Sequence, residues 1–216
     1  MCARFQIFTE EEVIEIRAII EEVSRKFGEG AVNTGEIRPT NSAPVLTLDG
    51  NRLAPCPVSW GFPKWDGKGV VINARSESAL QKPMFSKPLL TRRCVIPSTG
   101  FYEWAFASVL EPQITMFPVE RKPKVNEPKV KLFFRRPDEP MLYMAGMINT
   151  FLDKDGKAID AFVILTTEAN ASMSPFHNRM PVILSENERE DWISSETFMR
   201  RVLAREGPAL EWKIAG

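Results

Sequence analysis

The stretch MLYMAGMINTFLDKDGKAIDAFVILT, residues 141–166, contains two of the short apolar runs that decide the fold class of this chain. The runs Met141–Ile148 and Ala161–Thr166 have the length and composition of strands. Working outward, we expect further strands at Val70–Asn73, Cys94–Pro97, Val130–Phe134 and Pro181–Leu184, and short strands and turns over the proline-rich residues 31–60. Few helical patterns separate these strands, so the sequence predicts an α+β fold with mainly antiparallel β-sheets.

Three amphipathic segments predict helices on the outside of these sheets. Thr9 and Glu12 form a capping-box pattern before a helix over Glu10–Phe27, which Gly28 ends. A second capping box, Ser185 with Glu188, opens a helix through Trp192, and Glu196–Arg205 predicts a third. We expect one domain over residues 1–216, with an irregular surface insertion at about residues 105–128, where four prolines interrupt any periodicity.

Composition excludes several classes of function. Lys plus Arg and Asp plus Glu number 28 each, so a nucleic-acid site has to be a local basic patch. No apolar run is long enough for a signal peptide or a membrane span, which predicts a cytoplasmic location, or a nuclear one in a eukaryote. Three widely spaced cysteines and one histidine favour neither disulfides nor a metal site. Without a P-loop or a GxGxxG pattern, we expect no cofactor and no nucleotide.

Cys2 carries the most informative chemistry in the chain. Removal of Met1 would leave a cysteine with a free α-amine beside its thiol. An α-amine with a pKa of about 7.7–8.0 is substantially neutral near pH 7. It can add to an aldehyde to form an imine, which the thiol can close into a five-membered thiazolidine. The alternative is an incidental cysteine at a poorly ordered terminus.

Four segments concentrate reactive or anion-binding side chains: MCARF (1–5), NARSE (73–77), PSTGFYEW (97–104) and SPFHNRMP (174–181). Together they closely resemble the signature segments of the SOS response-associated peptidase (SRAP) family, whose members shield abasic sites in single-stranded DNA by cross-linking to them. The resemblance extends to WGF (60–62), RRCVIP (92–97) and ILTTEAN (164–170). It implies a barrel-like core of mainly antiparallel sheets with flanking helices.

The resemblance implies that Cys2 is the nucleophile and that Asn73, Glu103 and His177 complete the catalytic site. Each role is chemically reasonable. Glu103 suits the general acid and base that opens the closed sugar of an abasic site. His177 can donate a hydrogen bond to the sugar oxygen, and the Asn73 amide can orient the terminal cysteine.

Residues near these four suggest how DNA is held. Arginines near the reactive residues suit flanking phosphates, aromatic side chains suit base stacking, and one turn resembles the family's turn near the DNA channel. Arg75 could instead form a salt bridge with Glu77. The predicted DNA-binding residues are Arg4, Pro39, Thr40, Trp65, Arg75, Trp104 and Arg179.

The resemblance, together with the chemistry of Cys2, therefore implies a monomer that senses and shields abasic sites in single-stranded DNA through a thiazolidine cross-link. When bound to damaged DNA in the cytoplasm, it would be associated with the nucleoid. Reversal or autoproteolytic release would add peptidase, hydrolase or lyase-type activity. Two alternatives stay open. A cysteine autopeptidase or amidohydrolase could use Cys2, Glu103 and His177 to cleave peptides, with the thiolate as acyl acceptor. A noncatalytic single-strand-binding module would bind intact DNA equally well and would survive the Cys2→Ala substitution.

Overall fold

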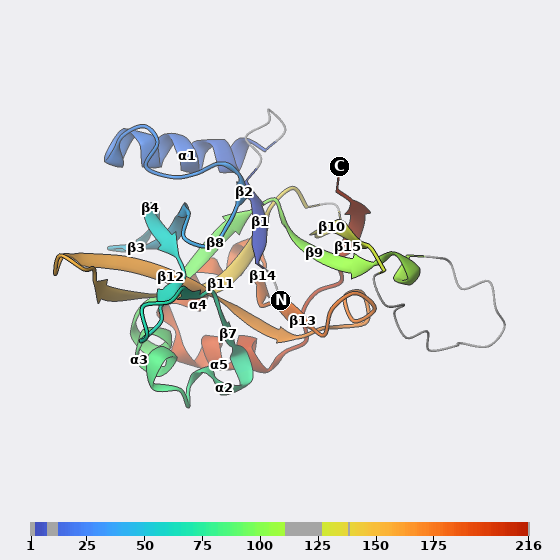
Figure 1. Cartoon of the computed structure of the whole chain (residues 1–216). Helices are drawn as coiled ribbons and strands as arrows, with labels where there is room; N and C mark the ends of the chain where they lie inside the picture. The colour runs from blue at the N-terminus through green and yellow to red at the C-terminus, as the bar shows by residue number, and fades with distance from the viewer. Residues whose placement is uncertain (1–2, 8–12, 111–126, 138, 216) are drawn as a thin grey trace.

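The computed structural model describes residues 3–7, 13–110, 127–137 and 139–215 (Figure 1). Its strands are β1 (Arg4–Ile7), β2 (Gly35–Ile37), β3 (Ser42–Asp49), β4 (Arg52–Trp60), β5 (Phe62–Pro63), β6 (Val70–Val71), β7 (Asn73–Arg75), β8 (Arg93–Ser98), β9 (Gly100–Phe106), β10 (Lys129–Arg135), β11 (Leu142–Leu152), β12 (Ala158–Glu168), β13 (Arg179–Pro181), β14 (Ile183–Leu184) and β15 (Glu211–Ile214). Its helices are α1 (Ile14–Phe27), α2 (Ser76–Ala79), α3 (Pro83–Thr91), α4 (Arg189–Ser194) and α5 (Glu196–Ala204), with single 3₁₀ turns η1 (Ala107–Val109) and η2 (Glu186–Glu188).

Five strands close into a barrel. Around the ring, β12 pairs with β4, β4 with β3, β3 with β8, β8 with β11, and β11 again with β12. The apolar runs at 141–148 and 161–166 supply two neighbouring strands, β11 and β12, and their side chains are almost all buried. Only the pairings of β12 with β4 and with β7 are parallel among the described strands. The predicted α+β fold with mainly antiparallel sheets and a barrel-like core is therefore confirmed.

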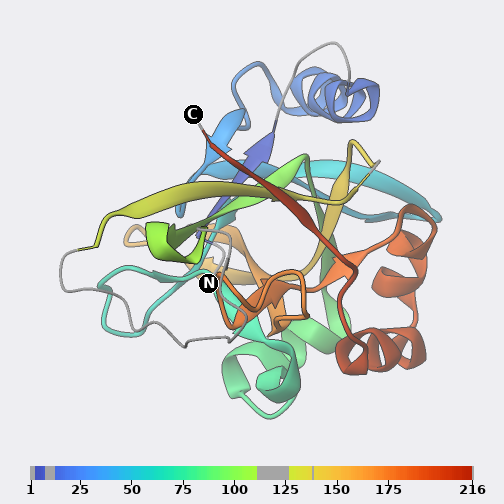
Figure 2. The ribbon, with the colours of Figure 1, turned by 90° about the vertical axis from the view of Figure 1, so that its right-hand side faces the viewer.

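A second sheet packs beside the barrel, in the strand order β15-β10-β9-β1-β2. Figure 2 shows the C-terminal strand β15 lying along β10. Because side chains alternate between the two faces of a strand, one face of this sheet carries Phe5, Phe101 and Phe134 into the core. The Phe5 ring lies 5.0 Å from that of Trp60 at the end of β4, and this contact joins the sheet to the barrel.

The helices lie at opposite ends of the molecule, with α1 at one end and α2, α3 and α5 at the other (Figure 1). Helix α1 buries Ile16, Ile19 and Val23 and ends at Gly28, whose φ of 96° suits glycine. The Thr9–Glu12 capping box lies outside the described residues. The Ser185–Glu188 capping box is confirmed at η2, which leads directly into α4.

Several boundaries differ from those expected. Val70–Asn73 is divided between β6 and β7, and Pro181–Leu184 between β13 and β14. The sequence analysis missed β1, β9 and β15 as strands. Ala105 and Phe106, expected to begin the insertion, complete β9 instead, because both continue its ladder with β10. Residues 111–126 of the expected insertion lie outside the described part of the chain. No described helix is long and apolar enough to cross a membrane.

Candidate active site

Glu103 lies on the inner face of β9. It stands opposite Leu132 of β10, and residues paired across antiparallel strands share a face. Phe101 and Phe134, also opposite each other, continue this face, so Glu103 is a carboxyl group at the edge of an aromatic core. Its residue is only 6% exposed. A carboxylate in such surroundings is costly to bury, which marks Glu103 as a candidate for chemistry rather than solubility.

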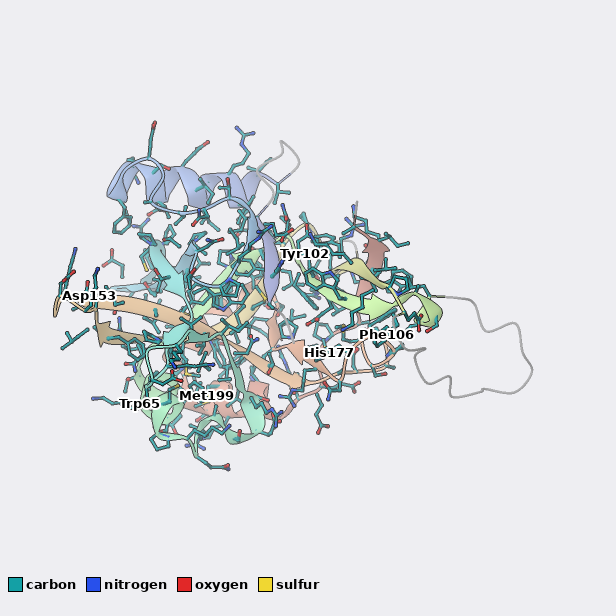
Figure 3. All side chains as sticks on the ribbon, viewed as in Figure 1. Trp65, Tyr102, Phe106, Asp153, His177 and Met199 are labelled. Carbon is teal, nitrogen blue, oxygen red and sulfur yellow. The ribbon has the colours of Figure 1, made fainter. Side chains whose placement is uncertain are left out.

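His177 is held on the same face by the residue before it. The Phe176 ring packs between Phe134 of β10 and Trp212 of β15, with ring centroids 5.4 Å and 5.1 Å away. This anchors the connection between β12 and β13 against the inner face that carries Glu103. Figure 3 shows His177 beside the second sheet.

The protonation of His177 follows from its contacts. Its Nδ1 accepts a hydrogen bond of 2.9 Å from the backbone N–H of Arg179. The neutral imidazole therefore carries its proton on Nε2, which is the atom left to donate. Burial lowers the pKa of His177, and the Glu103 carboxylate, the strongest charge acting on the ring, opposes that shift. The net direction is downward, so the neutral donor form persists at neutral pH.

Asn73 begins β7, which lies parallel to β12 with Asn73 opposite Ile164. The preceding carbonyl, of Ile72, accepts a 3.0 Å hydrogen bond from the indole of Trp60. Strand pairing and this indole contact thus fix the backbone on either side of the half-buried Asn73. The structure accordingly gives Asn73, Glu103 and His177 rigid supports on three separate elements.

Cys2 lies outside the described residues. The strand that follows it, β1, pairs with β9, and Arg4 stands opposite Tyr102, next to Glu103. The strand that carries the predicted general acid is thus the direct neighbour of the strand leading from the N-terminus. Among the described residues, no group of three or more His, Cys, Asp or Glu side chains is arranged to hold a metal ion.

Arg4 and Trp104 lie together, on the other face of β9 from Glu103. The Arg4 guanidinium stands 4.9 Å from the centre of the Trp104 ring and forms a 2.6 Å ion pair with Glu36. Lys131 also pairs with Glu36 and lies 4.0 Å over the ring of Tyr102. Because successive side chains of a strand point to opposite faces, the side chains of Trp104 and Glu103 point away from each other. Sequence reasoning missed Glu36 and Lys131, which carry no motif.

The remaining exposed candidates for DNA contact lie in the part of the chain between β2 and α2. Thr40 has a positive φ of 73°, and its N–H donates to the carbonyl of Trp60, so the turn containing Pro39 abuts the end of β4. Trp65 is 93% exposed in the connection between β5 and β6, well apart from His177 (Figure 3). Arg75 is exposed and forms no ion pair among the described residues.

Arg179 differs from the other predicted DNA contacts because it is buried. Its guanidinium donates to both oxygens of Glu77, at 2.7 Å and 2.8 Å, and to the carbonyl of Thr166 at 2.6 Å. Glu77, considered from sequence as a partner for Arg75, is therefore the partner of Arg179. The sequence placed both residues in signature segments but gave no signal that these segments meet.

Comparisons with known proteins identify the family of the chain. A family model described as SOS response associated peptidase (SRAP) matches residues 1–212. The Bacillus subtilis abasic site processing protein YoqW is 31% identical over 206 residues, covering 90% of this chain and 80% of that protein. The Escherichia coli abasic site processing protein YedK is 27% identical over 199 residues, covering 91% and 81%.

Solved structures agree in fold. A crystal structure of a protein from Bacteroides thetaiotaomicron superposes with a TM-score of 0.74 at 22% identity, covering 99% of this chain and 91% of that one. A second, from Bordetella bronchiseptica, has a TM-score of 0.73 at 20% identity and covers both chains completely.

Proposed function

Because the chain belongs to the SOS response-associated peptidase family, we propose that it processes abasic sites in single-stranded DNA by capturing them covalently. The observation that carries this proposal is the placement of Glu103 and His177 at one face of the second sheet. Phe176 packs the segment that carries His177 against this face, and β9, which carries Glu103 on it, pairs with the strand that leads from the N-terminus. Relatives named abasic site processing proteins support the choice of substrate.

The proposed reaction begins with opening of the abasic deoxyribose, which is mostly a closed hemiacetal. Glu103 removes the proton of the C1′ hydroxyl while Nε2–H of His177 donates a hydrogen bond to the ring oxygen as the C1′–O4′ bond breaks. The protonated Glu103 then transfers this proton to O4′, so the imidazole stays neutral. The observed hydrogen bond to Nδ1 of His177 supports this direction of donation. The products are an aldehyde at C1′ and a hydroxyl at C4′.

Capture follows at the terminal cysteine once Met1 has been removed. The α-amine of Cys2 adds to C1′, and loss of one water leaves an imine. The thiol then adds across the C=N bond: sulfur bonds to C1′ and the thiol proton moves to nitrogen, which closes the thiazolidine. In this scheme Asn73 holds the terminal cysteine in the attacking orientation. Hydrolysis of the adduct, assisted by Glu103 and His177, would release the DNA.

We further propose that the DNA strand is bound on the side of Asn73. Arg75, exposed and without an ion pair among the described residues, suits a flanking phosphate. Trp65 offers an almost fully exposed indole for base stacking. The turn at Pro39 and Thr40 borders the end of β4, where the Thr40 N–H donates to the carbonyl of Trp60. Arg4 and Trp104, on the opposite face of β9, would contact DNA that continues past the reacting sugar.

The test is incubation of protein, shown by intact mass to lack Met1, with single-stranded DNA bearing one abasic site. We expect a band that survives a denaturing gel for the wild type, and none for Cys2→Ala or for intact DNA. Absence of an adduct from fully processed protein would overturn the proposal. Peptide cleavage dependent on Cys2 would then support a peptidase, the activity that the family description names. Lesion-independent binding would support a noncatalytic module.

A further inference from the structure

The ion pair between Arg179 and Glu77 joins two segments that the proposed reaction uses. Arg179 is in β13, two residues after His177, and Glu77 is in α2, four residues after Asn73. Both guanidinium bonds to the carboxylate are shorter than 3 Å, in the two-pronged arrangement that fixes direction as well as distance. The third bond, to the carbonyl of Thr166, ties the same guanidinium to β12 between the two segments.

Strand pairing also joins the two segments, because β13 and β7 both pair with β12. Arg179 stands opposite Glu168 on β12, and Arg75 stands opposite Thr166 on the same strand. At the His177 end, the Arg179 backbone N–H is itself the donor to Nδ1. A shift of the Arg179 backbone therefore changes the hydrogen bond that decides which imidazole nitrogen carries the proton.

Burial makes the Arg179 guanidinium depend on its partner. The Arg179 side chain is 9% exposed, whereas that of Glu77 is 51% exposed. A surface ion pair is typically worth less than about 1 kcal/mol, but a buried cation that loses its carboxylate is left uncompensated. Burial raises the pKa of Glu77, but the hydrogen bonds and charge of Arg179, together with local hydrogen bonds, outweigh burial and lower the pKa overall. The carboxylate thus stays charged and holds Arg179.

We propose that Glu77 is a positioning residue: through Arg179 it holds the His177 imidazole with Nδ1 as acceptor and Nε2–H as donor. Only the predicted effect on the rate of cross-linking rests on the proposed function. Glu77 acts through Arg179 and touches no reacting atom. The same contacts leave the Arg179 guanidinium engaged within the protein.

The first test uses the single histidine of the chain as a spectroscopic reporter. In ¹⁵N-labelled wild-type protein above the pKa of His177, we expect one nitrogen with the shift of a protonated Nε2 and one with that of an unprotonated Nδ1. We expect the Nδ1 and Nε2 shifts to move towards each other in Glu77→Gln. We expect the same in Arg179→Lys, which keeps the positive charge but loses the two-pronged hydrogen bonding. Persistence of the wild-type shifts in both variants would overturn the proposal.

The second test separates binding from reaction. With saturating abasic DNA, we expect Glu77→Gln to cross-link about 10-fold more slowly than wild type, because Nε2–H of His177 is then misplaced relative to the sugar oxygen. Its Kd for DNA carrying an unreactive tetrahydrofuran site should stay equal or become tighter, since an anionic group near the strand is lost. An unchanged rate with unchanged imidazole shifts would refute the positioning role.

A matched control comes from the other end of β12. Asp160 accepts from Arg92 in a similar two-pronged pair, at 2.8 Å and 3.2 Å, away from His177. We expect Asp160→Asn to leave the imidazole shifts and the cross-linking rate unchanged. If Glu77→Gln moves the shifts but even wild type forms no adduct, the positioning role stands and the proposed function fails. If Glu77→Gln does not fold, Arg179→Lys decides the question.

Discussion

The ion pair between Glu188 and Arg205 provides a test of how much one carboxylate stabilises this fold. Arg205 follows α5, and its Nη2 lies 2.7 Å from Oε2 of Glu188, which also accepts the backbone N–H of Ser185 at 2.9 Å. A further bond of 3.0 Å runs from Arg205 to the carbonyl of Ile183 in β14. Glu188 therefore links η2, α5 and the edge of the barrel sheet, and Glu188→Gln removes its charge without changing its size.

The expected magnitude follows from proton linkage. The Arg205 guanidinium lowers the pKa of Glu188 from 4.5 to about 2. Each tenfold change in proton affinity is worth about 1.36 kcal/mol, so the upper limit is about 3.4 kcal/mol. Arg205 is 36% exposed, and solvent screening reduces this to about 1.5–2 kcal/mol. Because the folded pKa is below the unfolded one, this stability is present above about pH 4.5, and more than half of it is lost by about pH 3.

Urea denaturation of wild type and Glu188→Gln at pH 7 and pH 3 measures this contribution. We expect the variant to lose about 1.5–2 kcal/mol at pH 7 and less than half of that at pH 3. The control is Glu196→Gln, whose partner Arg200 lies one helical turn away at 2.7 Å with both side chains more than half exposed. It should change stability by less than about 0.5 kcal/mol at either pH. A loss at Glu188 that is equal at both pH values would refute the reasoning.

Three further perturbations test other parts of the structure. Trp65→Ala should leave the free energy of unfolding within about 0.5 kcal/mol of wild type, because the indole is 93% exposed, while weakening single-strand binding by about 1–3 kcal/mol in a fluorescence titration. Gly100→Ala should destabilise the protein by about 1–3 kcal/mol in thermal unfolding, because an added Cβ would lie 2.4 Å from the carbonyl of Phe134; wild-type stability would contradict the packing of β9 on β10. Glu103→Gln should lower the pKa of His177 further in an NMR titration, because the carboxylate now raises it; an unchanged titration curve would separate the two residues.

Apolar runs predicted strands of the barrel, but in the second sheet they predicted β10, at Val130–Phe134, and missed β1, β9 and β15. The apolar runs of β11 and β12 are buried on both faces, so their composition alone predicts strands. The run GFYEWAF of β9 contains a buried Glu and a half-buried Trp, so it is not a continuous apolar run. Its residues were interpreted as part of a signature segment with a catalytic Glu rather than as a strand. The strand became evident only from its pairing with β1 and β10. The local sequence of a strand does not identify the strands that will pair with it.

The candidate site, like the fold, could be predicted from the sequence only in part. Asn73, Glu103 and His177 were expected from signature segments, and the structure supplies what the segments lack, namely their faces and supports. It separates Trp104 from Glu103 because neighbouring residues of a strand point apart. It also pairs Arg179 with Glu77 across residues distant in sequence. Ion-pair partners of this kind depend on which strands become neighbours, so no spacing rule could have identified them.

Closure of the ring of β12, β4, β3, β8 and β11 determines when during synthesis the reactive groups come together. The N-terminus leaves the ribosome first, whereas β12 and the segment with His177 are made late in synthesis. Until β12 has joined the ring on both sides, Asn73 and His177 have no common support. A nascent or partly unfolded chain would thus carry its terminal amine without the groups that open a sugar. On the proposed function, chemical competence would belong to the finished barrel alone, and an unfinished chain would not cross-link to DNA.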